Sequence, residues 1–181
     1  MGFIRCIGIV LLIFQINWAW AQEEEAIPWE SSRKLSWSDF KDKPFKTAWA
    51  AATTASGISY QYTGREVPGG YALEFVVGAY FYPRKSWYQP QLCDEQVLAH
   101  EQLHFDISEL FARKLRKRLA ASTFTKNAKA EVKEIYTQLL LELNAFQSRY
   151  DHETNYSRDF EKQQEWNRMI GKALSESPQL P

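Results

Sequence analysis

The hydrophobic pattern of the chain changes its period at Pro90, and this change constrains the fold more than any other feature. Before Pro90, apolar and polar residues alternate, and turn formers stand at Ser56-Gly57 and at Pro68-Gly69-Gly70. Alternation bounded by turns predicts an antiparallel sheet of modest size. After Pro90, apolar residues recur every three or four positions, as they do in helices that bury one face. The sequence therefore predicts an α+β fold in which a small antiparallel sheet is followed by a helical half.

Three helices are expected in the second half of the chain. The first begins after Asp94, a residue suited to the N-cap, and it ends in basic residues that favour the negative end of a helix dipole. The second helix covers about residues 128–150 and the third about residues 159–174. No internal repeat interrupts this order, so residues 35–175 are expected to fold as a single domain.

The first 21 residues have the pattern of a secretory signal peptide. A basic residue, Arg5, precedes a short apolar stretch that ends in the small-residue pattern Ala19-Trp20-Ala21. The stretch is shorter than the roughly 20 apolar residues of a membrane-spanning helix. We therefore expect cleavage after Ala21, a secreted or periplasmic protein, and no stable membrane span. Residues 22–34 are expected to be a flexible acidic start and residues 176–181 a tail.

The composition of the mature chain narrows its partners. After cleavage, 21 Lys and Arg face 22 Asp and Glu, a net charge of −1. Such a balanced surface argues against nucleic acid as a partner. Of the two cysteines only Cys93 remains, so no internal disulfide can form. The domain, expected to be a monomer, must rely on its apolar core, on a bound metal, or on both.

The first predicted helix carries the motif His100-Glu101-Gln102-Leu103-His104. Residues four apart lie on the same face of a helix, so both imidazoles can reach one ion. Zn²⁺ takes neutral histidine nitrogens and keeps an open position for water. Glu101 could take a proton from that water as it attacks a carbonyl. His100 and His104 are thus candidate zinc ligands and Glu101 a candidate general base; a solvated polar helix face is the competing interpretation.

A catalytic zinc site usually has three protein ligands. The third histidine of the chain, His152, lies near the end of the second predicted helix, which could fold back on the first. It could equally be an exposed histidine that the helix dipole favours. An acidic ligand, Asp151 or Glu153, is a further alternative. Asp106 could orient a ligating imidazole or form an ion pair on the helix surface.

The chain resembles a family of predicted secreted bacterial zinc-dependent proteases, first described only as a domain of unknown function. The resemblance covers nearly the whole mature chain, and its most specific part is HEQLHFDI followed later by YDxET. It is carried by Trp37-Ser38-Asp39-Phe40-Lys41, Pro44, Ser86-Trp87, residues 99–107, Glu109, Arg113, Tyr150-Asp151, Glu153-Thr154, Gln163 and Trp166. It implies a zincin-like metalloprotease fold, Zn²⁺ as cofactor and a peptide or protein substrate.

The sequence departs from the family pattern at one position. After Tyr-Asp the pattern runs to Thr-x-His, and that late histidine is the natural third ligand; here Tyr156 stands in its place. Three interpretations follow: His152 replaces the missing ligand, Tyr156 itself ligates, or the site binds metal poorly. The resemblance implies a metal-dependent peptidase. There are two alternatives. The first is a degenerate zincin-like module of the cell envelope that binds a peptide, an envelope component or a metal without cleaving anything. The second is a structural metal site that holds the helices together.

Overall fold

The computed structural model of the chain describes residues 25–44 and 50–177. The predicted signal peptide and its cleavage site lie outside these residues. Within them the chain forms a small antiparallel sheet and three helices, which confirms the predicted α+β class. Two short 3-10 helices, Trp37–Asp39 and Pro83–Lys85, lie in the connections before the first long helix.

The main sheet is built on one long hairpin. Strands β3 (Ser56–Val67) and β4 (Gly70–Phe81) pair antiparallel along their whole length, and their register joins Ile58 to Ala79. The turn between them contains Gly69, whose φ of +89° is a left-handed value that glycine adopts without steric cost. Strand β1 (Ile27–Pro28) pairs with the other edge of β4, so the strand order is β1-β4-β3.

A second, two-stranded sheet lies at the end of the molecule that holds the start of the first helix. Strand β2 (Ala52–Thr53) pairs antiparallel with β5 (Trp87–Tyr88). Beyond β2, the Thr54 hydroxyl donates a hydrogen bond to the backbone oxygen of Glu101 at 3.2 Å. This bond places β2 beside the histidine motif.

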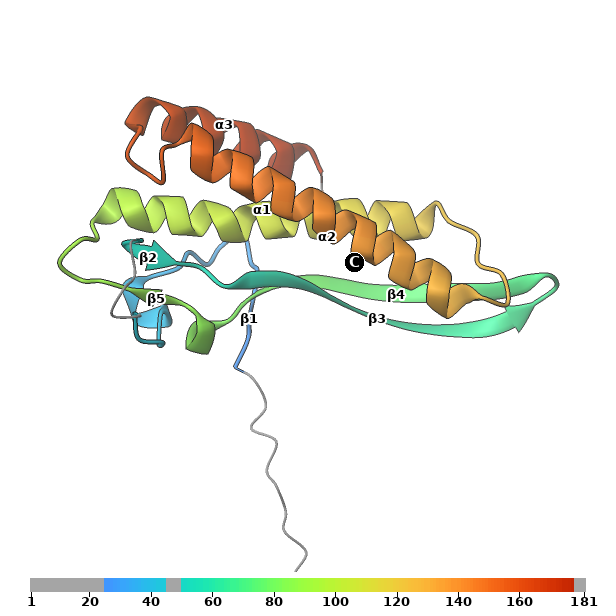
Figure 1. The fold of residues 1–181 in the computed structure, drawn as a ribbon. Coiled ribbons are helices and arrows are strands. Elements are labelled where there is room, and N and C mark those ends of the chain that lie inside the picture. Colours follow the sequence, from blue (N-terminus) through green and yellow to red (C-terminus); the bar gives the residue numbers. More distant parts are fainter. Residues whose placement is uncertain (1–24, 45–49, 178–181) are drawn as a thin grey trace, which may run out of the picture.

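Helix α1 (Glu95–Ala120) packs on the sheet, and α2 (Ala128–Glu153) and α3 (Phe160–Glu176) pack against α1 (Figure 1). The first half of α2 also reaches the sheet, where the Tyr136 hydroxyl donates to the backbone oxygen of Ile58 at 2.7 Å. The start of α1 is as expected, because the Asp94 side chain accepts a hydrogen bond from the backbone N–H of Val97. The sheet covers one side of α1 and the two helices cover the other, so nearly all of residues 100–112 are buried. Polar side chains in this stretch must therefore find partners inside the protein.

The segment after β1 is attached to the core. Trp29 is buried, and its backbone N–H donates to the backbone oxygen of Ala79 at 3.0 Å. The backbone N–H of Leu35 donates to the side-chain oxygen of Gln102. Residues 22–34 were expected to be a flexible start. The part of this segment that the structure describes instead pairs with β4 and packs on α1. Its alternation of apolar and polar residues is too short to reveal a strand, and tertiary contacts decide its structure.

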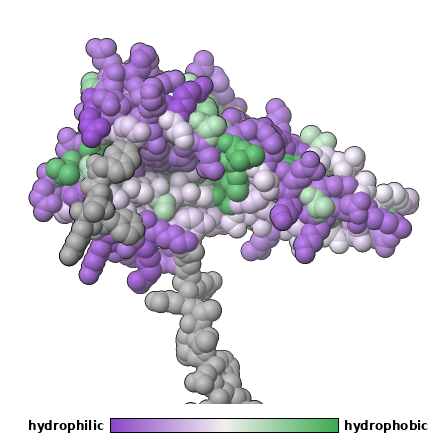
Figure 2. Space-filling model, in the orientation of Figure 1, coloured by the Kyte–Doolittle hydropathy of each residue, from purple (hydrophilic) through white to green (hydrophobic). Residues whose placement is uncertain are grey.

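The visible surface in Figure 2 is hydrophilic over most of α2 and α3, and the hydrophobic side chains on it are few and separate. Within the described residues, no helix has the length and apolar composition needed to span a bilayer.

Candidate metal centre

The two motif histidines lie one helical turn apart on α1 and point into the same space. Their Nε2 atoms are 3.3 Å apart, and their rings stand almost perpendicular, at 85°. His100 is buried and stacks on the ring of Tyr150 from α2, with the ring centroids 4.5 Å apart. The spacing of four residues thus brings both imidazoles together, as the motif predicts.

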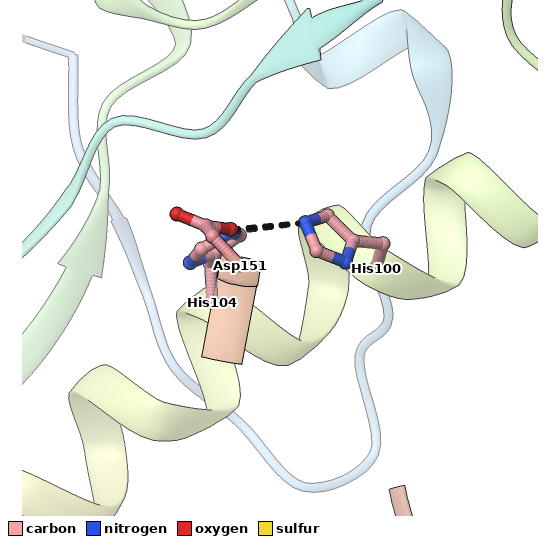
Figure 3. A group of neighbouring side chains, drawn as sticks. All are labelled: His100, His104 and Asp151. Carbon is pink, nitrogen blue, oxygen red and sulfur yellow. Dashed lines mark hydrogen bonds and ion pairs between the residues drawn. The ribbon is translucent and has the colours of Figure 1, made fainter. Parts of the chain in front are cut away.

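Asp151 of α2 completes the group. Its Oδ1 lies 3.2 Å from His100 Nε2 and 2.9 Å from His104 Nε2, so the carboxylate faces both imidazoles (Figure 3). Within residues 25–44 and 50–177, these three are the only cluster of His, Cys, Asp or Glu side chains whose ligand atoms converge closely enough for one ion.

The three ligand atoms fit a tetrahedral ion. Ligands about 2.0–2.1 Å from a tetrahedral Zn²⁺ are separated from each other by roughly 3.3 Å. The observed separations of 3.3, 3.2 and 2.9 Å lie near this length, with the edge between His104 and Asp151 shorter than the other two. Two imidazole nitrogens and one carboxylate oxygen are also ligand types that zinc accepts, and an ion held by these three would keep a fourth position for water.

The electrostatics of the group are those of tightly coupled opposite charges. Burial alone would raise the pKa of Asp151, but hydrogen bonds from His100 and His104 outweigh it and hold that pKa well below its usual range. Burial would likewise lower the pKa of His104, but the hydrogen bond to Asp151 outweighs this, so the His104 pKa is raised. The contact between His104 and Asp151 therefore favours the charged form of each group.

Glu101 lies beside this group with one carboxylate oxygen unsatisfied. Its side chain is buried, with 5% of the residue exposed. Among the described residues, no donor lies within hydrogen-bond distance of its Oε2. A buried carboxylate oxygen without a partner loses free energy relative to water, and Glu101 is the one side chain of this group whose polar atoms the described residues leave unsatisfied.

These side chains line a cavity with a volume of about 870 Å³. Residues 50–54 around β2 form one wall, and the first half of α1 and the last third of α2 form the others. The turn after α2 adds Tyr156, Ser157 and Arg158 to the lining. The cluster and strand β2 therefore line the same cavity.

Two other candidates for the third ligand, His152 and Tyr156, do not belong to this cluster. His152 is exposed and lies outside the cluster. Consecutive helical residues point about 100° apart, so Asp151 and His152 cannot both face α1. Tyr156 lines the cavity, in a left-handed turn where Asn155, Tyr156 and Ser157 have φ values of 47°, 53° and 72°.

Asp106 does not touch either imidazole. It accepts hydrogen bonds from the indole of Trp29 at 2.7 Å and the amide of Gln102 at 2.8 Å, and it pairs with Lys34 at 3.3 Å. Two residues past His104, it points about 200° away from that imidazole. The expectation that Asp106 orients a ligating histidine is therefore wrong, and Asp106 instead anchors the segment after β1.

The model of a bacterial protein family of unknown function, DUF922, matches residues 28–159. The chain belongs to this family. The matched range includes both motif histidines, Glu101 and Asp151, and it ends just before α3. No curated protein and no solved structure matches the chain. Membership in DUF922 therefore identifies the family without assigning an activity to it.

Proposed function

We propose that the chain is a zinc-dependent metallopeptidase with a zincin-like active site. His100, His104 and Asp151 would hold the ion. Asp151 would then be the third ligand, which the sequence left open between His152, Tyr156 and a carboxylate. The observation that carries the proposal is the triangle of ligand atoms, whose edges lie near those of a tetrahedral zinc site.

A zinc ion held by these residues would polarise a substrate carbonyl and lower the pKa of a water molecule towards about 7. Glu101 supplies the base: its unsatisfied Oε2 accepts a proton from the attacking water and returns it to the leaving amine. Burial of Glu101 keeps the carboxylate close to the reacting groups and shields it from bulk water.

A peptide substrate suits the shape of the cavity. The wall formed by residues 50–54 includes strand β2, which pairs with β5 on one side. An extended peptide that adds to a strand edge gains main-chain hydrogen bonds, and its side chains enter neighbouring pockets. The signal-peptide pattern of residues 1–21 supports action outside the cytoplasm, in the periplasm or after secretion.

A second candidate function is a zincin-like module that binds a peptide without cleaving it. It is favoured by Tyr156, which stands where the resembling family has a histidine and which lines the cavity with 44% of its surface exposed. The two functions differ in Glu101, because only an enzyme needs this carboxylate as a base.

The test compares Glu101→Gln with a control, Glu95→Gln, an exposed position on the same helix. The substrates are labelled casein and a mixture of random-sequence peptides. We expect Glu101→Gln to lower turnover by about 10²–10⁴-fold, the usual contribution of a general base, with zinc content unchanged. Glu95→Gln should leave both unchanged. Zinc binding without turnover in the wild type would support the binding module, and a wild type without zinc would contradict both.

A further inference from the structure

The outward nitrogen of each motif histidine meets a glutamine side chain. Nδ1 of His100 lies 3.0 Å from Oε1 of Gln163 on α3, and Nδ1 of His104 bonds Oε1 of Gln147 on α2. The two glutamines come from different helices, and each contacts one imidazole on the side opposite to Asp151. The two imidazoles are therefore held in the same way by separate elements.

Neighbouring groups fix which end of each amide faces its histidine. The amide nitrogen of Gln163 donates to Oδ1 of Asn167 at 3.0 Å, and this bond sets the orientation of the amide. The hydroxyl of Tyr150 lies 2.7 Å from the amide nitrogen and 2.9 Å from the amide oxygen, so it is compatible with either orientation. The amide nitrogen of Gln147 lies 3.4 Å from the hydroxyl of Ser108, which itself donates to a backbone oxygen. Because the amide nitrogens are used there, the amide oxygens face the imidazoles.

This arrangement selects one tautomer of each histidine. A neutral imidazole has one nitrogen that donates and one that accepts, whereas an amide oxygen can only accept. A hydrogen bond to the glutamine oxygen therefore requires the proton on Nδ1. It leaves the lone pair on Nε2, the nitrogen that faces Asp151 and the neighbouring imidazole.

We propose that Gln147 and Gln163 are positioning residues that hold both histidines in the Nδ1–H tautomer and so prepare the site for a divalent cation. The inference rests on the metal site of the proposed function, and it does not depend on peptidase activity. It also gives α3 a role, because Gln163 joins this helix to His100.

The two glutamines differ in burial, which predicts an asymmetry. Gln163 is 1% exposed and belongs to a network with Tyr150 and Asn167, so water cannot replace its oxygen. Gln147 is only partly buried and lines the cavity, where a water molecule can reach Nδ1 of His104. Loss of the amide oxygen should therefore weaken metal binding more at Gln163 than at Gln147.

The experiment measures zinc affinity by competition with a chromophoric chelator, for leucine and glutamate variants at both positions. Loss of a group that orients a metal ligand typically lowers metal affinity 10–100-fold. We expect losses in this range for Gln163→Leu and smaller ones for Gln147→Leu. Glutamate, which keeps an acceptor oxygen, should restore affinity to within a few-fold of wild type. Gln138→Leu, at an exposed position of α2, is the control and should change nothing.

The zinc affinities of the leucine and glutamate variants show whether the glutamines orient the histidines or only fill space. If the glutamines only fill space, leucine should be tolerated and a buried glutamate should be the worse replacement, which would overturn the inference. A second readout is the imidazole Nδ1–H proton in NMR spectra of the zinc-loaded protein. One slowly exchanging signal per histidine is expected, and each leucine variant should lose its protection at one of them. Circular dichroism of the metal-free variants checks that they fold.

Failure of the inference differs from failure of the proposed function. If the wild type binds zinc and both leucine variants bind it equally well, only the positioning role is wrong. If the wild type binds no zinc, both the positioning role and the proposed function are wrong.

Discussion

Helix α1 carries two buried clusters of polar side chains, one at each end of its covered stretch, and they differ in how far they are satisfied. The cluster near its C-terminal half consists of Glu109, Arg113 and Arg116. Glu109 accepts from Arg113 at 2.8 Å and from Arg116 at 3.3 Å. Each guanidinium group also donates to a backbone oxygen. Arg113 donates to the oxygen of Leu174 at 2.6 Å, and Arg116 donates to the oxygen of Val77 at 2.7 Å. This cluster links α1 to α3 and to β4.

The cluster near the N-terminal half consists of His100, Glu101 and His104 with Asp151. Here two imidazole nitrogens and a carboxylate oxygen converge on one space, and Glu101 keeps an oxygen with no partner among the described residues. Unsatisfied polar groups in a buried position destabilise the fold. The comparison teaches that the side chains of the first cluster satisfy one another, whereas the second leaves a buried carboxylate oxygen without a partner among the described residues.

The largest expected effect on stability lies in the complete cluster. In Glu109→Gln the two partly buried guanidinium groups lose their counter-charge. Removal of one partner from a buried ion pair costs about 3–5 kcal/mol of unfolding free energy, which urea denaturation measures. Zinc affinity should stay at the wild-type value. A large loss of zinc affinity in a variant that still folds would show that the two clusters are not separate.

A smaller and pH-dependent effect is expected for Asp151→Asn in the metal-free protein. The pKa of His104 is raised from 6.5, so its contribution to stability is present below that pH and disappears as the pH rises through the raised value. The pKa of Asp151 is lowered from 3.8, so its contribution is present above that pH and is lost in stronger acid. Between these two pH limits, a hydrogen bond to a charged group contributes about 1.5–3 kcal/mol to the free energy of unfolding.

The pH profile of that variant distinguishes the pair from ordinary packing. Thermal unfolding at about pH 5.5, between the two unshifted values, should show the full destabilisation by Asp151→Asn, and at pH 9 it should show much less. An equal loss at both values would mean that Asp151 acts through its shape and not through its charge.

Asp106→Asn should separate the anchor of the N-terminal segment from the metal centre. Trp29 and Gln102 both donate to Oδ1, so an amide oxygen can keep these two bonds, although it carries no charge. Lys34, which pairs with Oδ2, loses its acceptor. We expect a loss of about 1 kcal/mol of unfolding free energy. Zinc affinity should be unchanged, because Asp106 touches neither imidazole. A tenfold weaker affinity, measured by chelator competition, would return Asp106 to the role expected from the sequence.

The smallest effect is expected at a surface ion pair. Arg118 and Glu142 form two hydrogen bonds, at 2.8 and 2.6 Å, and the bond from Arg118 lowers the pKa of Glu142. Both side chains are more than one third exposed, so solvent screens the pair. Glu142→Gln should cost about 0.2–1 kcal/mol at pH 7, and less as the pH falls below 4.5 or as salt is added. A loss as large as that of Glu109→Gln would contradict the distinction between exposed and buried clusters.

The sequence predicted those features that local spacing controls. The alternation around Pro68-Gly69 predicted the hairpin, Asp94 predicted the start of α1, and the spacing of four predicted that His100 and His104 share a face. Each of these depends on residues that are near each other in the chain, so the pattern alone was sufficient.

The third ligand depends on how α2 is rotated where it crosses α1, and no local pattern contains that rotation. Asp151 and His152 are neighbours in the chain, and a rotation of α2 by about 100° would exchange them. The left-handed turn at Asn155–Ser157 also carries no glycine that could have revealed it. The sequence named Asp151 as an acidic alternative ligand and as a candidate to orient a histidine, but only the packing of α2 on α1 brings it to the cluster.

The most direct test of the proposed centre is the zinc affinity of the purified protein and of three variants, Asp151→Ala, His152→Ala and Tyr156→Phe. We expect the wild type, His152→Ala and Tyr156→Phe to bind one zinc ion with similar affinity. Asp151→Ala should lose more than the 10–100-fold that removal of an outer partner costs. Full zinc binding by Asp151→Ala together with its loss in His152→Ala would contradict the proposed centre.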